Sequence, residues 1–254
     1  MCSVSLPVID YFLLFGVGIV AGFINVIAGG GSFFVLPLMM FIGIPPAVAN
    51  ATNRVAVLLQ SISGVAGFKS KGVNISRFSI YLSISALIGA VIGTQLAIEI
   101  DQNLFKKSIS VFMLILVFFT VLFTKHHYKP EEALLKGKNL IFSIIIFFFI
   151  GIYGGYIQAG VGFLIMAALT GINKLDLVRT NSIKMFVNVV YTAIALIIFA
   201  YQIKIEWTAG LWLAAGNMLG AWISSRWSVN TESKTLKYVT LGVFVILAVA
   251  LWFY

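Results

Sequence analysis

The chain has 254 residues, of which 61% are hydrophobic and 10% are charged, and its mean hydropathy is +1.05. Soluble domains contain about 25% charged residues, so this composition excludes an ordinary soluble protein and indicates an integral membrane protein. The net charge of +9 does not indicate nucleic-acid binding, because the basic residues lie in short connections between apolar segments, where they set topology. The single cysteine, Cys2, excludes an internal disulfide and a cysteine-based metal cluster.

Apolar segments follow one another along the whole chain and predict an all-α membrane protein. Ten are expected, at about 8–28, 31–44, 47–68, 77–98, 103–124, 139–158, 160–171, 177–201, 206–224 and 235–253. A cleaved signal peptide is not expected, because the start lacks a basic region. The segments at 31 and 160 are short: twelve helical residues span ~18 Å, well below the ~30 Å thickness of the hydrocarbon core.

The two halves carry similar features in the same order. Gly22 and Asn25 correspond to Gly155 and Gln158; Ala28, Gly29 and Gly31 correspond to Ala159, Gly160 and Gly162; Gly43, Thr52, Asn53 and Gln60 correspond to Gly171, Thr180, Asn181 and Asn188. This order predicts one transmembrane domain made of two repeats, residues 1–128 and 129–254, joined by a cytoplasmic linker at about 125–139.

The distribution of basic residues distinguishes two topologies. If all ten segments cross, twelve Lys and Arg residues fall on one side and three on the other; if both short segments re-enter, the same residues split eight against seven. Because cytoplasmic loops are enriched in Lys and Arg, the ten-crossing topology is favoured, with both termini outside. Five crossings in each half make the two repeats inverted relative to each other.

Each half contains a glycine-rich break at a membrane-length segment, at Gly29, Gly30 and Gly31 and again at Gly160 and Gly162. Glycine lets the backbone leave helical geometry, and non-helical backbone at membrane depth survives only inside protein or beside a cavity. We expect the following helices to begin near Ser32 and Phe163, and their N-termini to bind an anion. The alternative is that small residues only allow close helix packing.

A polar face follows each break. Asn53, Arg54 and Gln60 lie on one expected helix, and Asn181, Lys184 and Asn188 lie on another. Polar groups in hydrocarbon are costly, so these faces should line the bundle interior or a wet cavity and form a substrate path. Alternatively, the amides join helices while Arg54 and Lys184 extend to an interface.

The acidic residues all lie at segment ends or in connections, so no buried carboxylate relay of the kind common in proton-coupled carriers is expected. His126 and His127 are adjacent in a basic connection and are expected to be solvated. The sequence contains no HExxH, GxSxG or Walker A motif. We therefore expect no enzyme activity, no catalytic residue, no metal and no cofactor.

The sequence resembles the sulfite exporter TauE/SafE family of membrane permeases over nearly the whole chain, and the first repeat is the more specific match. The resemblance rests on the glycine-rich run from Gly22 to Leu38, with Pro37, and on the polar run from Ala49 to Asn53. The second repeat departs from the pattern, because Val161 interrupts the glycines and Ala168 stands where Pro37 predicts proline. The resemblance implies transport of sulfite or organosulfonates across a bacterial cytoplasmic membrane.

These observations together predict a secondary transporter that exports small sulfur-containing anions, with the substrate bound between the two breaks. An anion channel, a transporter of other organic anions, an intramembrane enzyme subunit and a subunit of a larger complex remain as alternatives. The expected partners are a small anion and the lipid bilayer, and the oligomeric state is left open. The expected substrate-binding residues are Asn25, Gly29, Gly30, Gly31, Ser32, Asn53, Arg54, Gln60, Gln158, Gly160, Gly162, Asn181, Lys184 and Asn188.

Overall fold

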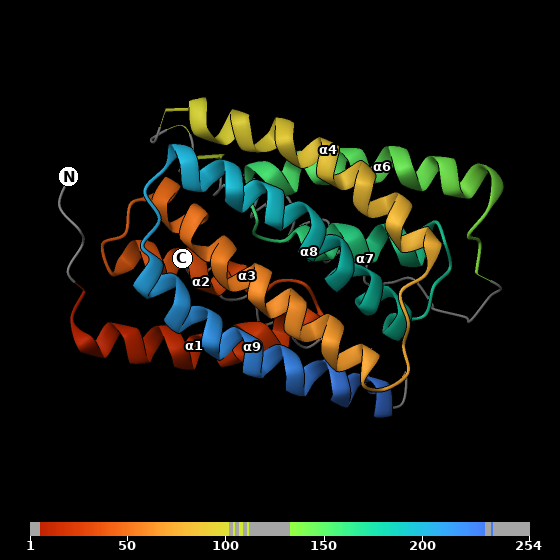
Figure 1. Cartoon of the computed structure of the whole chain (residues 1–254), viewed down its shortest axis with the longest axis horizontal. Helices are drawn as coiled ribbons and strands as arrows, with labels where there is room; N and C mark the ends of the chain where they lie inside the picture. Colours follow the sequence, from red (N-terminus) through yellow and green to blue (C-terminus); the bar gives the residue numbers. More distant parts are fainter. Residues whose placement is uncertain are drawn as a thin grey trace.

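The computed structural model describes residues 6–101, 104, 107, 108, 111, 133–231 and 235, and in these residues it has eight α-helices and no strand (Figure 1). The helices are α1 (Val8–Ile27), α2 (Ser32–Phe41), α3 (Pro46–Lys69), α4 (Arg77–Glu99), α6 (Gly137–Tyr156), α7 (Val161–Gly171), α8 (Leu177–Gln202) and α9 (Trp207–Asn230). The predicted all-α class is thereby confirmed. Four of the helices, α1, α4, α6 and α8, are long and apolar enough to cross a membrane.

Eight of the ten expected segments correspond to these helices. The largest difference is at α9, which continues to Asn230 although the apolar pattern suggests an end near residue 224. The additional residues, 225–230, include Ser225 and Ser228, which are both buried. Because polar residues that face the interior of a membrane bundle lower the local hydropathy, the hydropathy pattern ends before the helix does. The expected segments 103–124 and 235–253 lie almost entirely outside the described residues.

Apolar side chains cover much of the outer surface of the bundle, and many polar side chains lie inside it. Along α4, Ile80, Ile84, Ile88 and Leu96 are each at least 45% exposed. Buried polar residues include Asn53, Arg54 and Lys184, which are fully inaccessible to solvent. A membrane-spanning bundle requires this arrangement, since the lipid in contact with its surface is apolar.

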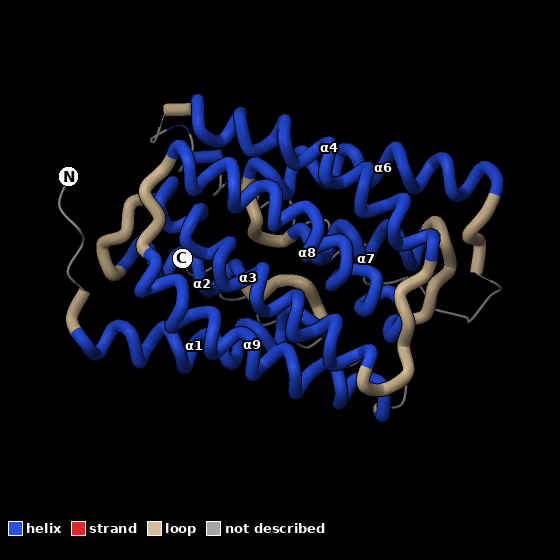
Figure 2. Tube along the Cα trace, in the orientation of Figure 1, coloured by secondary structure: helices blue, strands red, loops and turns tan. Residues whose placement is uncertain are grey.

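The two glycine-rich breaks lie inside the bundle. Residues 25–33 and 157–163 are buried without interruption, whereas the α3–α4 connection is largely exposed. In Figure 2 both breaks lie in the middle of the molecule, while the other described connections lie at its two ends. Helices α1 and α2 therefore form one helical hairpin, and α6 and α7 form another, each with its turn in the interior of the bundle.

The prediction that every short segment crosses the membrane is corrected by this geometry. Helices α2 and α7 have 10 and 11 residues, so they span only ~15–17 Å. The distribution of twelve basic residues against three is unaffected by this correction. A hairpin brings the chain back to the end of the molecule from which it entered, as two crossings would. The connections at one end and the ends of their helices carry Lys69, Lys71, Arg77, Lys136, Lys138, Lys174, Arg179 and Arg226 (Figure 1).

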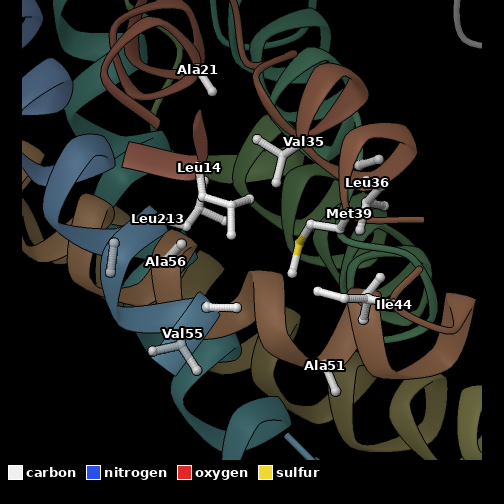
Figure 3. Close-up of a cluster of buried hydrophobic side chains, with 14 of the residues drawn as sticks. Leu14, Ala21, Val35, Leu36, Met39, Ile44, Ala51, Val55, Ala56 and Leu213 are labelled. Atoms are coloured by element: carbon white, nitrogen blue, oxygen red, sulfur yellow. The ribbon is translucent and has the colours of Figure 1, made fainter. Parts of the chain in front are cut away.

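The helices pack as two bundles that each combine parts of both halves. Helix α9 packs against α1 and α3, and α4 packs in the corresponding way against α6 and α8. One hydrophobic cluster is drawn mainly from α1, α2, α3 and α9, as Figure 3 shows for Leu14, Met39, Val55 and Leu213. A second cluster is drawn from α4, α6, α7 and α8. Corresponding helices of the two halves run in opposite directions (Figure 1), in agreement with the inverted relation, which stays a prediction.

Pairs of glycines bring the helices within each bundle into backbone contact. The pattern of two glycines four residues apart occurs in α1, α4, α6 and α9, at Gly18 and Gly22, Gly89 and Gly93, Gly151 and Gly155, and Gly216 and Gly220. A β-carbon on any of these glycines would collide with the backbone of the helix that it faces. Small residues allow the two backbones to approach closely. The resulting van der Waals packing stabilises helix association in a membrane, where the hydrophobic effect does not drive helices together because lipid tails are themselves apolar. Gly22 and Gly155, which correspond to each other in the two halves of the sequence, thus serve helix packing.

The packing role of these glycines is testable with two positions on α1. Valine at Gly18 should lower the melting temperature of the protein in detergent by several degrees, because its β-carbon would lie 2.6 Å from the Leu213 carbonyl oxygen, and such overpacking costs ~1–3 kcal/mol. The control is Gly16→Val, at an exposed position with no atom within 4 Å of the added β-carbon. Equal melting temperatures for the two variants would contradict the packing role.

Candidate functional site

The two breaks share one backbone feature, a glycine in the left-handed region. Gly29 has φ +88° and Gly160 has φ +77°. Residues with a β-carbon rarely adopt these angles, so glycine is required at each of the two breaks, where the chain reverses direction inside the bundle. The correspondence predicted from sequence between Gly29 and Gly160 therefore appears in the backbone conformation of the two breaks.

The breaks touch each other directly. A β-carbon on Gly29 would lie 2.5 Å from the Gly162 carbonyl carbon, and one on Gly162 would collide with Gly29. Beside this contact the rings of Phe33 and Phe163 stack, with centroids 5.6 Å apart. In this conformation there is no space for a substrate between Gly29 and Gly162. The predicted location between the breaks therefore requires the two breaks to separate.

The helix starts after the breaks are close to those expected. Helix α2 begins at Ser32 as predicted, and α7 begins at Val161, two residues before the predicted Phe163. The first-turn amides are partly engaged, since Phe33 N donates to Gly30 O and Phe163 N donates to Gly160 O, both at 3.0 Å. An anion at these helix starts would compete with bonds that close the first turn.

Arg54 binds the end of a helix in the other half of the chain. Its Nη1 donates to the Gly154 carbonyl at 3.0 Å and to Gln158 Oε1 at 3.1 Å, and its Nη2 donates to the Gly155 carbonyl at 2.6 Å. Its guanidinium lies over the Phe199 ring, 4.7 Å from the centroid. The last carbonyls of a helix have no intrahelical donor and carry partial negative charge, so Arg54 caps the C-terminus of α6.

Lys184 makes the corresponding contact in the opposite direction. Its Nζ donates to the Val26 carbonyl at 2.7 Å, in the last turn of α1, and to Asn181 Oδ1 at 2.8 Å. A cation on α3 thus caps α6, and a cation on α8 caps α1. Both side chains are fully buried, so the alternative that they extend to an interface does not hold in this structure.

The charges of Arg54 and Lys184 have no acidic partner among the described residues. The ion pairs found there are Arg179 with Asp176 and Lys204 with Glu206, and both lie outside the helix interiors. Helix C-termini carry roughly half a negative charge each, so they compensate the two cations only in part. The interior around the breaks is therefore electropositive.

The remaining amide side chains of the site include some that form hydrogen bonds and some with atoms that have no partner among the described residues. Asn53 Nδ2 donates to Ser32 Oγ at 3.2 Å, which ties α3 to the start of α2. Gln158 Nε2 donates to the Tyr191 hydroxyl at 2.8 Å. Buried polar atoms without a hydrogen-bond partner in the described part of the chain include Asn53 Oδ1, Arg54 Nε, both side-chain polar atoms of Gln60, Ser61 Oγ, Asn181 Nδ2 and Asn188 Oδ1.

Gln60 and Asn188 occupy the crossing of α3 and α8. The two helices pack together and run in opposite directions (Figure 1), and Gly64 packs on the Met185 side chain. Asn188 lies about one turn after Met185, and Gln60 lies about one turn before Gly64, so the two amides are at the same level. Both polar atoms of the Gln60 amide and the Asn188 Oδ1 atom are buried without a hydrogen-bond partner among the described residues, and buried polar groups of this kind usually have a water or another partner.

Sequence reasoning did not assign site roles to three residues at the second break. Asn50 Nδ2 donates to the Tyr156 carbonyl at 3.1 Å, Tyr191 accepts from Gln158, and Phe199 supports Arg54. Asn50 and Tyr191 lie on the predicted polar faces, which was the available signal; an apolar Phe199 gave none. Asn25 lies buried in α1 with its β-carbon 3.0 Å from the position a β-carbon would take on Gly31.

The capping role of Arg54 is testable by its removal. Arg54→Gln should leave the Gly154 and Gly155 carbonyls without a charged donor, and each unsatisfied buried group costs ~1–3 kcal/mol. Thermal unfolding in detergent, followed by tryptophan fluorescence, should show a lower midpoint. Arg77→Gln, at the exposed first residue of α4, serves as the control and should leave the midpoint near that of the unmodified protein. An unchanged midpoint for Arg54→Gln would show that the cap does not stabilise the fold.

Comparisons with known proteins agree with a membrane role. The chain is 29% identical over 225 residues to a probable membrane transporter protein of Haemophilus influenzae, covering 88% of this chain and 87% of that protein. It is 26% identical to the probable membrane transporter protein ORF9 of Sinorhizobium (94% and 90% covered) and 24% identical to the probable membrane transporter protein YfcA of Escherichia coli K12 (94% and 88% covered). No solved structure matches.

The model of the family described as sulfite exporter TauE/SafE matches residues 14–251, which is nearly the whole chain. The matched span includes both breaks, the polar faces of α3 and α8 and, apart from the first six residues of α1, all the helices that form the two bundles. The chain therefore belongs to the sulfite exporter TauE/SafE family of membrane transporters.

Proposed function

We propose that this membrane transporter exports small sulfur-containing oxyanions, such as sulfite or organosulfonates, across the cytoplasmic membrane of a bacterium. The family description supports the sulfur oxyanion, and the relatives are named transporters rather than enzymes. The correspondence between the breaks, and the matching packing of α9 and α4, supports a transporter built from two inverted repeats, residues 1–128 and 129–254.

The electropositive interior is the observation that carries this proposal. Arg54 and Lys184 are both fully buried, and their described neighbours include neutral amides and helix C-termini but no carboxylate. A buried charge that lacks full compensation attracts a counter-ion. A small anion would complete the charge balance, and a cation would be repelled.

The direction of transport follows from the charge distribution and the membrane potential. The end of the molecule that carries the basic connections is assigned to the cytoplasm, which places the termini outside. An interior-negative potential favours anion exit by ~2.3 kcal/mol per charge per 100 mV, roughly 50-fold in concentration ratio. With no carboxylate relay among the described helices, the potential is the driving force we propose.

A carrier is favoured over a channel by the closed interior. The contact of Gly29 with Gly162 and the stacked rings of Phe33 and Phe163 fill the middle of the described bundle. A substrate can pass only if these contacts separate, which is the behaviour of a carrier with alternating access.

The substrate and its energetics are testable in proteoliposomes that contain only this protein. Sulfite efflux should be saturable, should exceed that of protein-free vesicles, and should accelerate when the interior is made negative with a potassium gradient and valinomycin. Sulfate and methanesulfonate as competitors would define which oxyanions the site accepts. Efflux that ignores the imposed potential would contradict the uniport proposal, and absence of flux for all three anions would contradict the proposed substrate class.

Gln60 offers a separate test, because its amide has no partner in the described structure. If the amide contacts water or substrate only during transport, Gln60→Met should reduce sulfite flux about tenfold or more, since one lost contact of this kind can be worth ~1–3 kcal/mol. Thermal stability should stay equal or rise, because a buried unsatisfied amide is removed. The matched control is Gln202→Met at the exposed end of α8. Normal flux in Gln60→Met would exclude the amide from the path.

A further inference from the structure

The two sequence repeats are not the two packed bodies of this molecule. Among the described helices, each packed bundle takes three from one half and one from the other: α1, α2 and α3 with α9, and α6, α7 and α8 with α4. The two larger hydrophobic clusters follow largely the same division, since one is built mainly from the first set and the other from the second. The first also contains Phe163 and Phe199 of the second set, and a small third cluster joins α1, α3 and α9 to Met185 of α8. The halves are thus interlocked through the exchange of α4 and α9.

Interfaces inside each bundle are built for permanent contact. Along α1 and α9, glycines at positions 18, 22, 216 and 220 place the two backbones against each other, and the glycines of α4 and α6 do the same. Interiors packed at this density do not slide, because each glycine position admits one register. Separation of α9 from α1 would also expose the hydrophobic cluster around Leu14 and Leu213 (Figure 3).

The boundary between the bundles has a different chemistry. Its extended helix contact is α3 on α8, and it contains the unpartnered amide of Gln60 and the unpartnered Oδ1 atom of Asn188. The contacts across it also include hydrogen bonds of Arg54, Lys184 and Asn50 to backbone carbonyls of the opposite bundle, the contact between the two breaks, and the stacked rings of Phe33 and Phe163. A small apolar cluster of Val26, Phe68, Met185 and Ala221 lies there as well. Water or an anion can replace the polar contacts at small cost. Among the described residues, the close glycine contact between backbones across the boundary is that of Gly29 with Gly162, whereas eight glycines hold the helices together inside the bundles.

We infer that transport proceeds by movement of the bundle α1, α2, α3 and α9 against the bundle α4, α6, α7 and α8, which opens the α3–α8 boundary as the anion path. The inference rests on the proposed function and replaces movement of one sequence repeat against the other. Opening would hydrate Gln60 and Asn188 and would free Arg54 and Lys184 from their helix ends, so that both cations become available to an oxyanion.

Two engineered disulfides separate the two mechanisms, because both join the sequence halves but only one joins the bundles. A β-carbon on Gly64 of α3 would lie 3.7 Å from Met185 Cβ of α8, across the boundary. A β-carbon on Gly210 of α9 would lie 3.3 Å from Val55 Cβ of α3, inside one bundle. Disulfides have Cβ–Cβ distances of about 3.5–4.5 Å, so the first pair fits directly and the second needs a shift of a few tenths of an ångström.

The pairs Gly64→Cys with Met185→Cys and Val55→Cys with Gly210→Cys would be made in a Cys2→Ser background. Sulfite flux would be measured in proteoliposomes after oxidation and again after reduction, with the extent of cross-linking read by mass spectrometry. The oxidised Gly64/Met185 pair should lose about tenfold or more of its flux, because a covalent link prevents the boundary from opening, and reduction should restore it. The oxidised Val55/Gly210 pair should keep the flux of its reduced form.

Loss of flux in both oxidised pairs would overturn the inference in favour of moving sequence halves, and full flux in both would place the moving boundary elsewhere. Hydrogen–deuterium exchange of α3 and α8 tests the inference without any substrate. Exchange should slow in the oxidised Gly64/Met185 pair and stay unchanged in the other, since only the first closes the boundary. That result together with no sulfite flux would reject the proposed function alone, and equal exchange in both pairs would reject the inference.

Discussion

Helix ends that stop inside the membrane bundle are the constraint on which the rest of this structure depends. Helices α1 and α6 both end in the interior, where water does not reach the last carbonyls, and an unsatisfied backbone group there costs several kcal/mol. Lys184 and Arg54 donate hydrogen bonds to carbonyls in the last turns of α1 and α6, and each residue comes from the opposite half of the chain. The same two residues that make the breaks possible also make the interior electropositive, so the structural requirement and the proposed anion site have one origin.

Much of this arrangement could be predicted from the sequence. Hydrophobic segments located the eight described helices because lipid requires apolar surfaces of membrane length, and the Gly29 and Gly160 correspondence located the breaks. Glycine pairs four residues apart were open to two interpretations, since the same residue serves a break or a packed interface. Gly22 and Gly155 proved to be packing residues, and only their neighbours in space, Asn217 and Ala90, distinguish the two roles.

The sequence could not show where the buried cations point. Arg54 and Lys184 lie near the starts of their helices, where extension to an interface is a reasonable expectation. Their actual partners are carbonyls 100 or more residues away in the chain, and no local pattern encodes such a distance. The exchange of α4 and α9 was hidden for the same reason, because helix order along the chain does not determine which helices share a core.

The exchange also bears on how the chain is made. The glycine face of α1 stays without its partner until α9 has been synthesised, so the first half inserts into the membrane with its packing surfaces incomplete. An ancestor that consisted of a single repeat would have met the same problem, and a second copy inserted upside down would have supplied the missing helix to each partner. On this view the fused chain would preserve a swapped dimer within one polypeptide.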